Sequence, residues 1–242
     1  MRTALVTGGS GGIGKECGRR LRELGYDVVL VARREAPLRT AAAEIGARHI
    51  MADASDADGF ASAISVVNSI HLVVHAAGTL GGTYARKQTF AQWRDIMSAN
   101  LDSCFVVTAA VLPRMRAGSR LVFVSSSAAH EPMPGRTAYS ASKAGVNAFA
   151  RALALEVDRD GIGVHLVTPG PVETEMLQDV PFEMHAIQAS DVAAAVAWLD
   201  TVGPSVDLPE IRLAAVRRGP FARPPVVPTE ARRRARAADP SP

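Results

Sequence analysis

The stretch TALVTGGSGGIG, residues 3–14, decides the fold of this chain. Its first five residues are apolar or β-branched, which is typical of a buried parallel strand. Five glycines follow within the next seven residues, and apolar residues then recur at helical spacing from Ile13 to Leu24, so we expect a helix to begin near Gly12. A strand, a tight turn and a helix N-terminus direct backbone N–H groups and the helix dipole at an anion, and glycine lets a pyrophosphate come close. The stretch therefore predicts a dinucleotide cradle.

Two other interpretations of the glycine loop are weaker. Gly9 and Gly14-Lys15 have the spacing of a P-loop, but Glu16 stands where that loop needs Ser or Thr to bind magnesium. A tight turn that binds nothing is the plain alternative, because G-x-G-x-x-G alone is weak evidence. We expect these loop residues to contact the dinucleotide: Gly8, Ser10, Gly11, Gly12, Ile13 and Gly14.

The end of the second expected strand, Asp27–Val31, favours one cofactor over another. A site for NAD places an acid about twenty residues past the glycine loop, where it binds the ribose hydroxyls. Ala32 occupies that place, and Arg33 and Arg34 follow. Guanidinium groups bind a 2′-phosphate bidentately, whereas a carboxylate would repel it. The sequence therefore favours NADP (NADPH) over NAD, although two arginines on an ordinary solvated surface would look the same.

Asp53 follows a third apolar run, His49–Ala52, and Ala54 comes next. At the end of a parallel strand, the Asp53 carboxylate would reach the adenine edge of the cofactor, with Ala54 beside it. The alternative is that Asp53 is the N-cap of the following helix, a common role for Asp at such a corner. Both interpretations stay open on the sequence alone.

The stretch YSASK, residues 139–143, carries the pattern of proton-transfer chemistry. Tyr139 and Lys143 are four residues apart in an expected helix over 138–155, so they lie on one face. A free tyrosine keeps its proton until about pH 10, and an adjacent ammonium stabilises the phenolate that a general acid/base must form. Ser126 follows the expected central strand 121–124, where its hydroxyl can bond an oxygen that gains charge. A surface helix contact is the plain alternative for the Tyr–Lys pair.

Together these motifs resemble the short-chain dehydrogenase/reductase family over about residues 1–215. The matching residues are Thr7-Gly8-x-x-x-Gly12-x-Gly14, Asp53, Ala77-Gly78, Asn100, Ser126, Tyr139, Lys143 and Pro169-Gly170-x-Val172-x-Thr174. The resemblance implies that Tyr139 is the catalytic acid/base and that Lys143 also holds the nicotinamide ribose. It implies that Ser126 positions the substrate carbonyl and that Asn100 anchors a water in the proton relay. The further cofactor contacts that it implies are Ala76, Ala77, Gly78, Asn100, Tyr139, Lys143, Pro169, Gly170, Val172 and Thr174.

The chain departs from the pattern of this family in three places. His75 and Ala76 stand where the family has two asparagines, and we expect His75 to be a satisfied core histidine rather than a catalyst. The segment 175–188, which would form the lid over the substrate, is short. The glycine-rich ending of the family is absent, and Glu210–Leu213 is expected to be the last strand. This departure puts the usual tetramer contacts in doubt, although the family implies a homodimer or homotetramer joined through the helices of Asn100 and Tyr139.

The composition indicates one α/β domain, residues 1–218. Strand-like and helix-like stretches alternate, which predicts a single doubly wound parallel sheet, Rossmann-like, with helices on both faces. The two cysteines, Cys17 and Cys104, are expected to be small core residues, as in a reducing cytoplasm, rather than a disulfide or metal site. No signal peptide is expected, because Met1-Arg2 leads directly into a strand. No apolar run approaches the ~20 residues of a membrane span.

Residues 219–242 differ in kind. They are rich in proline and hold five arginines against two acidic residues, which accounts for the net charge of +3 of the whole chain. We expect a disordered tail, since such a segment cannot bury a core. The tail is either a functionless extension or a basic arm for nucleic acid. We favour the extension, because the rest of the chain has no basic excess to form a binding face.

These observations predict an NADP(H)-dependent oxidoreductase that interconverts a carbonyl compound and its alcohol, in the direction of reduction, without a metal. Three alternatives stay open: a non-catalytic cofactor-sensing protein, an NAD-dependent alcohol dehydrogenase, and an epimerisation or dehydration on the same scaffold. We expect a mostly apolar substrate. Ser126 and the following residues are expected to face it: Ala128, His130, Met133, Met176, Phe182 and Met184. A loop position on the surface is the alternative for His130.

Overall fold

The computed structural model describes residues 2–179, 184–203, 206–217, 222–223 and 226. Its centre is a seven-stranded sheet with the order β3-β2-β1-β4-β5-β6-β9, and every pair of neighbouring strands is parallel. This arrangement confirms the predicted doubly wound α/β fold. The strands are β1 (Thr3–Thr7), β2 (Asp27–Ala32), β3 (Arg48–Met51), β4 (Leu72–His75), β5 (Arg120–Val124), β6 (Gly163–Pro169) and β9 (Glu210–Leu213).

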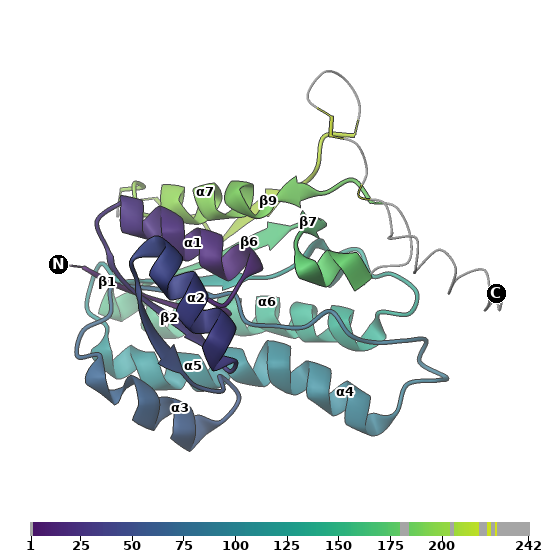
Figure 1. Cartoon of the computed structure of the whole chain (residues 1–242), viewed down its shortest axis with the longest axis horizontal. Coiled ribbons are helices and arrows are strands. Elements are labelled where there is room, and N and C mark those ends of the chain that lie inside the picture. The colour runs from purple at the N-terminus through teal and green to yellow at the C-terminus, as the bar shows by residue number, and fades with distance from the viewer. Residues whose placement is uncertain (1, 180–183, 204–205, 218–221, 224–225, 227–242) are drawn as a thin grey trace.

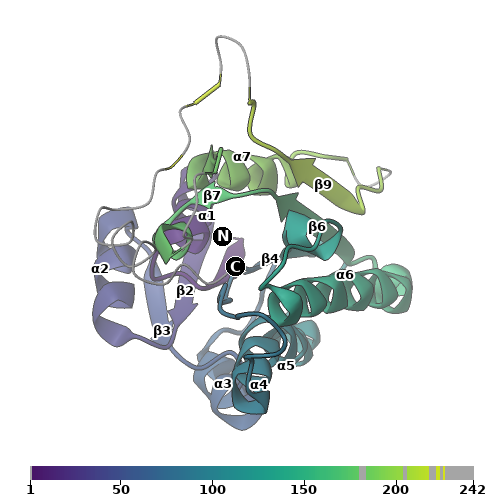
Figure 2. The same cartoon turned by 90° about the vertical axis from the view of Figure 1, so that its right-hand side faces the viewer.

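Helices cover both faces of the sheet, as Figures 1 and 2 show. In one layer, α1 packs against α2 and α7; in the other, α3 packs against α5, and α4 packs against α6. A short parallel pair, β7 (Val172–Glu173) with β8 (Ile187–Gln188), follows β6. The helices are α1 (Gly12–Glu23), α2 (Glu35–Ile45), α3 (Ala57–Ala63), α4 (Phe90–Met97), α5 (Ser103–Val111), α6 (Thr137–Val157) and α7 (Ala189–Leu199).

Strand β1 shows why the sheet is covered on both faces. Successive side chains of a strand point to opposite faces, so an unbroken apolar run needs a core on each side. Leu5 packs into the cluster that includes Phe60 of α3 and Val107 of α5. Ala4 and Val6 pack into the other cluster, with side chains of α1 and α7. The sequence of β1 therefore fixes a three-layer fold.

The carboxyl edge of the sheet has a crevice where the strand order changes direction. The chain adds β2 and β3 on one side of β1, and then returns to add β4, β5, β6 and β9 on the other side. Ligands of open α/β sheets bind where the loops after such strands diverge. The glycine loop follows β1 and residues 76–78 follow β4, so the fold brings both predicted cofactor segments to this crevice.

The glycine loop is held together by close backbone approaches. A Cβ atom at Gly14 would collide with the carbonyl oxygen of Gly8. At Gly8, where φ is +69°, a Cβ would lie 2.7 Å from the carbonyl oxygen of Ala76. Only glycine combines such a φ with so close an approach. The start of α1 and the loop after β4 therefore depend on these two residues for their positions.

We expect Gly14→Ala to destabilise the protein by about 1–3 kcal/mol and to weaken NADPH binding, because over-packing forces the loop to shift. Gly203→Ala is the matched control, since Gly203 lies outside the glycine loop and a Cβ there meets nothing within 4 Å. Thermal unfolding and fluorescence titration with NADPH check the prediction. Equal stability and affinity in the two variants would contradict it.

The helical stretch Phe90–Arg114 is longer and more apolar than the sequence led us to expect. It has 25 residues and a mean hydropathy of 1.5 in its most apolar window, so by length and composition alone it could cross a membrane. Half of that window is buried inside the protein. The stretch holds α4, the π-helical turn η2 (Ser98–Asp102) and α5, which pack against α3 and α6. It is therefore a core helix of the second layer.

Other predictions about single elements agree with the structure. Helix α6 contains the predicted 138–155, and β9 matches the predicted last strand. Cys17 and Cys104 are buried and unpaired, and burial raises the pKa of their thiols to about 12 and about 11. Of the tail, only residues 222, 223 and 226 are described, so the boundary near 218 stays a prediction.

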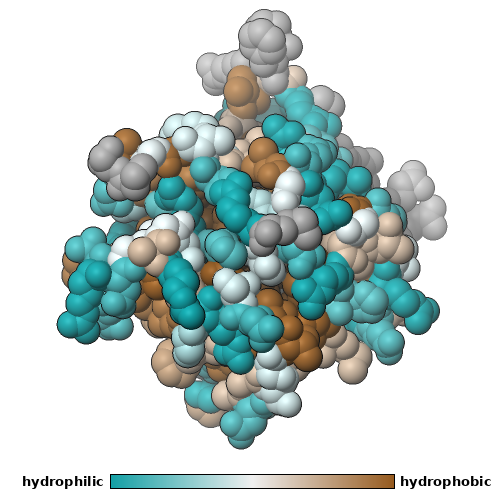
Figure 3. All heavy atoms as spheres, turned by 90° about the vertical axis from the view of Figure 1, so that its left-hand side faces the viewer, coloured by the Kyte–Doolittle hydropathy of each residue, from teal (hydrophilic) through white to brown (hydrophobic). Residues whose placement is uncertain are grey.

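Figure 3 shows the face on the left of Figure 1, near the start of β1. Hydrophilic side chains cover most of this face, and smaller apolar areas lie between them. The crevice at the carboxyl ends of the strands lies at the opposite edge of the sheet.

Candidate active site

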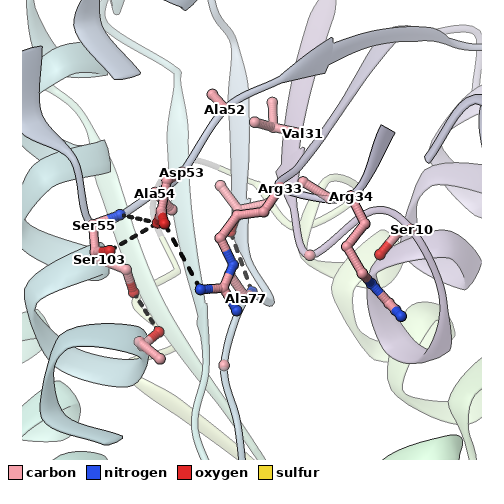
Figure 4. Close-up of a pocket in the computed structure, with 15 residues that line it drawn as sticks. Ser10, Val31, Arg33, Arg34, Ala52, Asp53, Ala54, Ser55, Ala77 and Ser103 are labelled. Carbon is pink, nitrogen blue, oxygen red and sulfur yellow. Dashed lines mark hydrogen bonds and ion pairs between the residues drawn. The ribbon is translucent and has the colours of Figure 1, made fainter. Parts of the chain in front are cut away.

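A first cavity of about 200 Å³ lies at the carboxyl ends of β1, β2 and β3 (Figure 4). Its wall combines the end of β1 and the glycine loop with the residues that follow the other strands and with the turn from η2 into α5. The predicted cofactor residues that line it are Gly8, Ser10, Arg33, Arg34, Asp53, Ala54, Ala77 and Gly78. Thr7 of the glycine-loop motif also lines it, and the lining residues that the sequence did not single out are Val31, Ala52, Ser55, Ala99 and Ser103.

Arg33 and Asp53 face one another across the first cavity (Figure 4). Arg33 Nη1 lies 3.7 Å from Asp53 Oδ2, and Asp53 Oδ1 accepts hydrogen bonds from Ser55 N at 2.9 Å and Ser55 Oγ at 2.7 Å. Burial raises the pKa of Asp53, but the two Ser55 bonds and the Arg33 charge outweigh it and lower the pKa overall. Asp56 caps α3 by accepting from Gly59 N, so the N-cap interpretation of Asp53 is wrong.

Arginines flank the end of β2 where a carboxylate would select NAD. Arg33 and Arg34 are both exposed, and Arg34 lies on the same side as Ser10 in Figure 4. The small side chain of Ala32 is part of the same wall. The rim of the first cavity is therefore basic, with the one ionised carboxyl of Asp53 already paired. Such a rim suits a phosphate group.

A second cavity, of about 350 Å³, lies at the ends of β5 and β6 and holds the predicted reaction site. Ser126 and Tyr139 both line it, although they come from different elements. The predicted cofactor residues in its wall are Ile13, Pro169, Gly170, Val172 and Thr174. The predicted substrate residues in its wall are Ala128, Met133, Met176 and Met184. The lining residues that the sequence analysis missed are Leu80, Ser125, Ser127, Glu131, Pro132, Arg136, Pro171, Leu177 and Arg217.

The glycine loop reaches both cavities, because Ser10 lines the first and Ile13 lines the second. A dinucleotide that lies across the loop would therefore place one end in each cavity. Gly11, Gly12 and Gly14 line neither cavity; they shape the turn and the start of α1. Ala76 also lines neither cavity, and its backbone carbonyl meets Gly8 instead.

Tyr139 and Lys143 lie on one face of α6, as predicted, and both are buried. Lys143 Nζ donates to the carbonyl oxygen of Val124, the last residue of β5, at 2.9 Å. A Cβ at Gly78 would lie 3.8 Å from Nζ, so the ammonium also sits close to the loop after β4. This geometry holds the charge between the helix and the strand end. The actions of Lys143 on Tyr139 and on the ribose stay predictions.

Asn100 is fully buried in the π-helical turn η2 between α4 and α5. Its Oδ1 accepts from Thr79 N at 2.7 Å, and its Nδ2 donates to Thr79 O at 3.0 Å and to Ser142 Oγ at 3.0 Å. The side chain thus fastens the loop after β4 to α6. Single-turn π-helices are frequent at functional sites. The sequence carried no signal for this one, and the water-anchoring role of Asn100 stays a prediction.

His130 lines a cavity next to the second one that shares Ser127, Glu131 and Arg217 with it, and its Nε2 lies 2.8 Å from Glu210 Oε1. Its contact with substrate stays a prediction. His75 is a core residue, stacked on Phe123 at 4.1 Å, and burial lowers its pKa to about 3. Its Nε2 has no hydrogen-bond partner among the described residues, so the expectation of a satisfied histidine is wrong. Phe182 lies outside the described residues.

No group of three His, Cys, Asp or Glu side chains that could hold a metal ion is found within the described part of the chain. The polar side chains around the two cavities are mostly hydroxyls and guanidinium groups. Such groups suit proton transfer and phosphate binding.

The family model for short chain dehydrogenases matches residues 2–184 of the chain. An acetoacetyl-CoA reductase of Cupriavidus necator is 33% identical over 224 residues, covering 83% of this chain and 91% of that protein. A putative ketoacyl reductase of Streptomyces coelicolor is 35% identical over 190 residues, covering 73% of each chain.

Solved structures show the same likeness in three dimensions. A single-residue variant of the actinorhodin polyketide ketoreductase with NADPH has a TM-score of 0.81 and 30% identity, covering 87% of this chain and 95% of that one. A short chain dehydrogenase from Burkholderia cenocepacia in complex with NADP has a TM-score of 0.80 and 28% identity, covering 88% and 96%. The match of the family model, the parallel sheet and the order of the motifs agree. This chain belongs to the short chain dehydrogenase family.

Proposed function

We propose that this protein is an NADP(H)-dependent carbonyl reductase that converts a ketone or aldehyde into its alcohol. One observation carries the proposal. A proton donor, Tyr139, and a second hydroxyl, Ser126, line one cavity whose wall also holds the residues predicted to meet the nicotinamide. The buried ammonium of Lys143 is on the same helix face as Tyr139. Relatives that are named as reductases of acetoacetyl-CoA and of ketoacyl groups support it.

The residues of the chain fit a bound dinucleotide. Its pyrophosphate would meet the backbone of the glycine loop, whose shape depends on the close backbone approaches at Gly8 and Gly14. The adenosine half would occupy the first cavity, beside Asp53, and its 2′-phosphate would meet Arg33 and Arg34. When bound, the cofactor supplies the hydride. The neighbours solved with NADP and NADPH support this choice over NAD.

Side chains of the protein would transfer the proton and bind the carbonyl oxygen of the substrate. Ser126 Oγ would hydrogen-bond the carbonyl oxygen of the substrate, and Tyr139 would donate a proton to that oxygen as it gains charge. Lys143 would stabilise the resulting phenolate, because an ammonium next to an anion lowers its energy. Asn100 fixes the loop at Thr79 and would support the return of a proton.

The second cavity favours a compound that is mostly apolar around its carbonyl. Three methionines line it, and flexible thioethers adapt to varied shapes. Glu131, Arg136 and Arg217 also line it, so a polar end of the substrate has charged groups to meet. The test is incubation of the protein with NADPH and a panel of ketones and ketoacyl thioesters. We expect equal amounts of NADPH consumed and alcohol formed.

We also propose that the protein is a homo-oligomer in a reducing cytoplasm. Phe105 of α5 and Leu155 of α6 are 62% and 84% exposed, on the helices that the family resemblance assigns to subunit contact. Large exposed apolar side chains are typical of protein interfaces. The two unpaired cysteines fit a reducing compartment. Light scattering of the full chain is expected to give a dimer or tetramer, and a monomer would contradict the proposal.

A further inference from the structure

Helix α6 holds the end of β5 at two successive residues. Lys143 Nζ donates to the carbonyl oxygen of Val124, and the hydroxyl of Ser125 donates to Asn147 Oδ1 at 2.5 Å. Ser125 and Asn147 are both buried, at 3% and 4% exposure. Asn147 is one helical turn after Lys143 and two turns after Tyr139, so all three lie on one face. The strand end that leads to Ser126 is therefore tied to the helix that carries Tyr139.

The same asparagine meets the other end of the loop. Ser126 Oγ accepts from Ala128 N at 3.2 Å and so caps a short 3₁₀ turn, η4 (Ser127–Ala129), which ends at His130. Asn147 Nδ2 lies 3.2 Å from His130 Nε2. Ser126 thus lies in a loop whose two ends converge on one side chain of α6.

Glu210 of β9 contacts the His130 ring at Nε2. Its carboxylate accepts from Arg151 Nη2 at 3.1 Å and from Arg212 Nε at 3.1 Å. Burial raises the pKa of Glu210, but hydrogen bonds from Arg212 and His130 outweigh it and lower the pKa to about 2, so the group is ionised at neutral pH. Arg212 Nη2 faces His130 Nδ1 at 3.4 Å, so Nδ1 accepts and Nε2 carries the hydrogen toward Glu210. Asn147 Nδ2 is itself a donor, so it packs against Nε2 at 3.2 Å without a hydrogen bond to it. The histidine is thereby held in one orientation.

We infer that Asn147, bonded to Ser125 and packed against His130, is a positioning residue that sets the distance from Ser126 to Tyr139. The inference rests on the proposed function. Ser126 and Tyr139 must reach one substrate oxygen together, yet one follows β5 and the other lies on α6, and the loop that joins these elements does not by itself fix their spacing. Displacement of a catalytic group by about 1 Å can cost on the order of 10²-fold in rate. A buried bond between the two elements removes that freedom.

The test is kcat for a reducible ketone in Asn147→Ala, Ser125→Ala and the double variant. We expect each single variant to lose about tenfold in kcat and the double variant to lose no more, since contacting residues that act through one bond are not additive. NADPH affinity should stay unchanged, because Asn147 lines neither cavity. Ser140→Ala is the matched control, since its buried hydroxyl on α6 has no hydrogen-bond partner among the described residues; its kcat should stay within about twofold.

Two results would overturn the inference: an unchanged kcat in Asn147→Ala, or losses that multiply in the double variant. Glu210→Gln covers the case in which Asn147→Ala does not fold, because it keeps the shape of the side chain and removes the charge that holds His130. Like Asn147→Ala, this variant should have a lower kcat and an unchanged affinity for NADPH. An unchanged kcat would count against the inference. If the proposed function itself is wrong, the result differs, because the wild-type protein then reduces no ketone at all.

Discussion

Tyr139→Phe is expected to lower kcat for ketone reduction by about 10²–10⁴-fold, the usual contribution of a positioned general acid. The substitution removes one oxygen and keeps the ring that fills the wall of the second cavity. Without the phenolic hydroxyl, the proposed proton donor to the substrate oxygen is lost, and Ser126 would still only hydrogen-bond that oxygen. NADPH binding should persist, since the glycine loop and the arginines are untouched.

Tyr26→Phe is the matched control for this prediction. Tyr26 is also buried, and its hydroxyl donates to Asp200 at 2.6 Å. Tyr26 directly precedes β2, so it lies at the amino ends of the strands, away from the two cavities. Its loss should lower the melting temperature and leave kcat unchanged, because a buried hydrogen bond to a charged group stabilises by about 1.5–3 kcal/mol. Activity of Tyr139→Phe equal to that of Tyr26→Phe would show that another group supplies the proton.

Arg33→Ala is expected to weaken NADPH binding by about 10- to 100-fold and to leave NADH binding nearly unchanged, because a guanidinium–phosphate bond contributes about 1.5–3 kcal/mol. Only NADPH carries the 2′-phosphate that Arg33 would meet at the first cavity. The exposed position of Arg33 makes the effect sensitive to salt, so the preference for NADPH should shrink as ionic strength rises. Parallel fluorescence titrations with the two cofactors measure the ratio.

Arg39→Ala controls for the loss of one positive charge, since Arg39 is exposed on α2 and does not line the first cavity. Ala32→Asp makes the reciprocal change. A carboxylate at that place would repel the 2′-phosphate and could bind the ribose hydroxyls of NADH, so the preference should move toward NADH. If Arg33→Ala and Arg39→Ala change the two affinities equally, the phosphate is bound elsewhere.

Local sequence patterns were enough to predict the elements that carry the chemistry. The glycine loop, the apolar run of β1 and the helical spacing after Gly12 each act over a few residues, and β1 and α1 appear where those patterns put them. The spacing of Tyr139 and Lys143 also needs only helical geometry. The absence of an acid at Ala32 indicated a phosphate-binding rim, and the first cavity has a basic rim there.

The rest depends on contacts between residues far apart in the chain. The sequence left Asp53 open between a cofactor contact and a helix cap, and the structure gives the cap to Asp56, three residues later. Nothing in the sequence near Asn100 indicated a π-helical turn, which packs against α4, α5 and α6 in the structure. The contact of His130 with Glu210, eighty residues away, could not be predicted from the sequence around either residue. The hydrogen bond from Ser125 to Asn147 could not be predicted from the sequence either, since it forms only when the end of β5 packs against α6.

The central claim is that hydride and proton meet at a carbonyl beside Tyr139. The most direct measurement uses NADPH that carries deuterium at its transferable position, with a ketone found active in the panel, and mass spectrometry of the alcohol. The account predicts one deuterium on the carbinol carbon in the wild-type product, and almost no product from Tyr139→Phe. Product without deuterium, or an epimerised or dehydrated product with NADPH unconsumed, would contradict it.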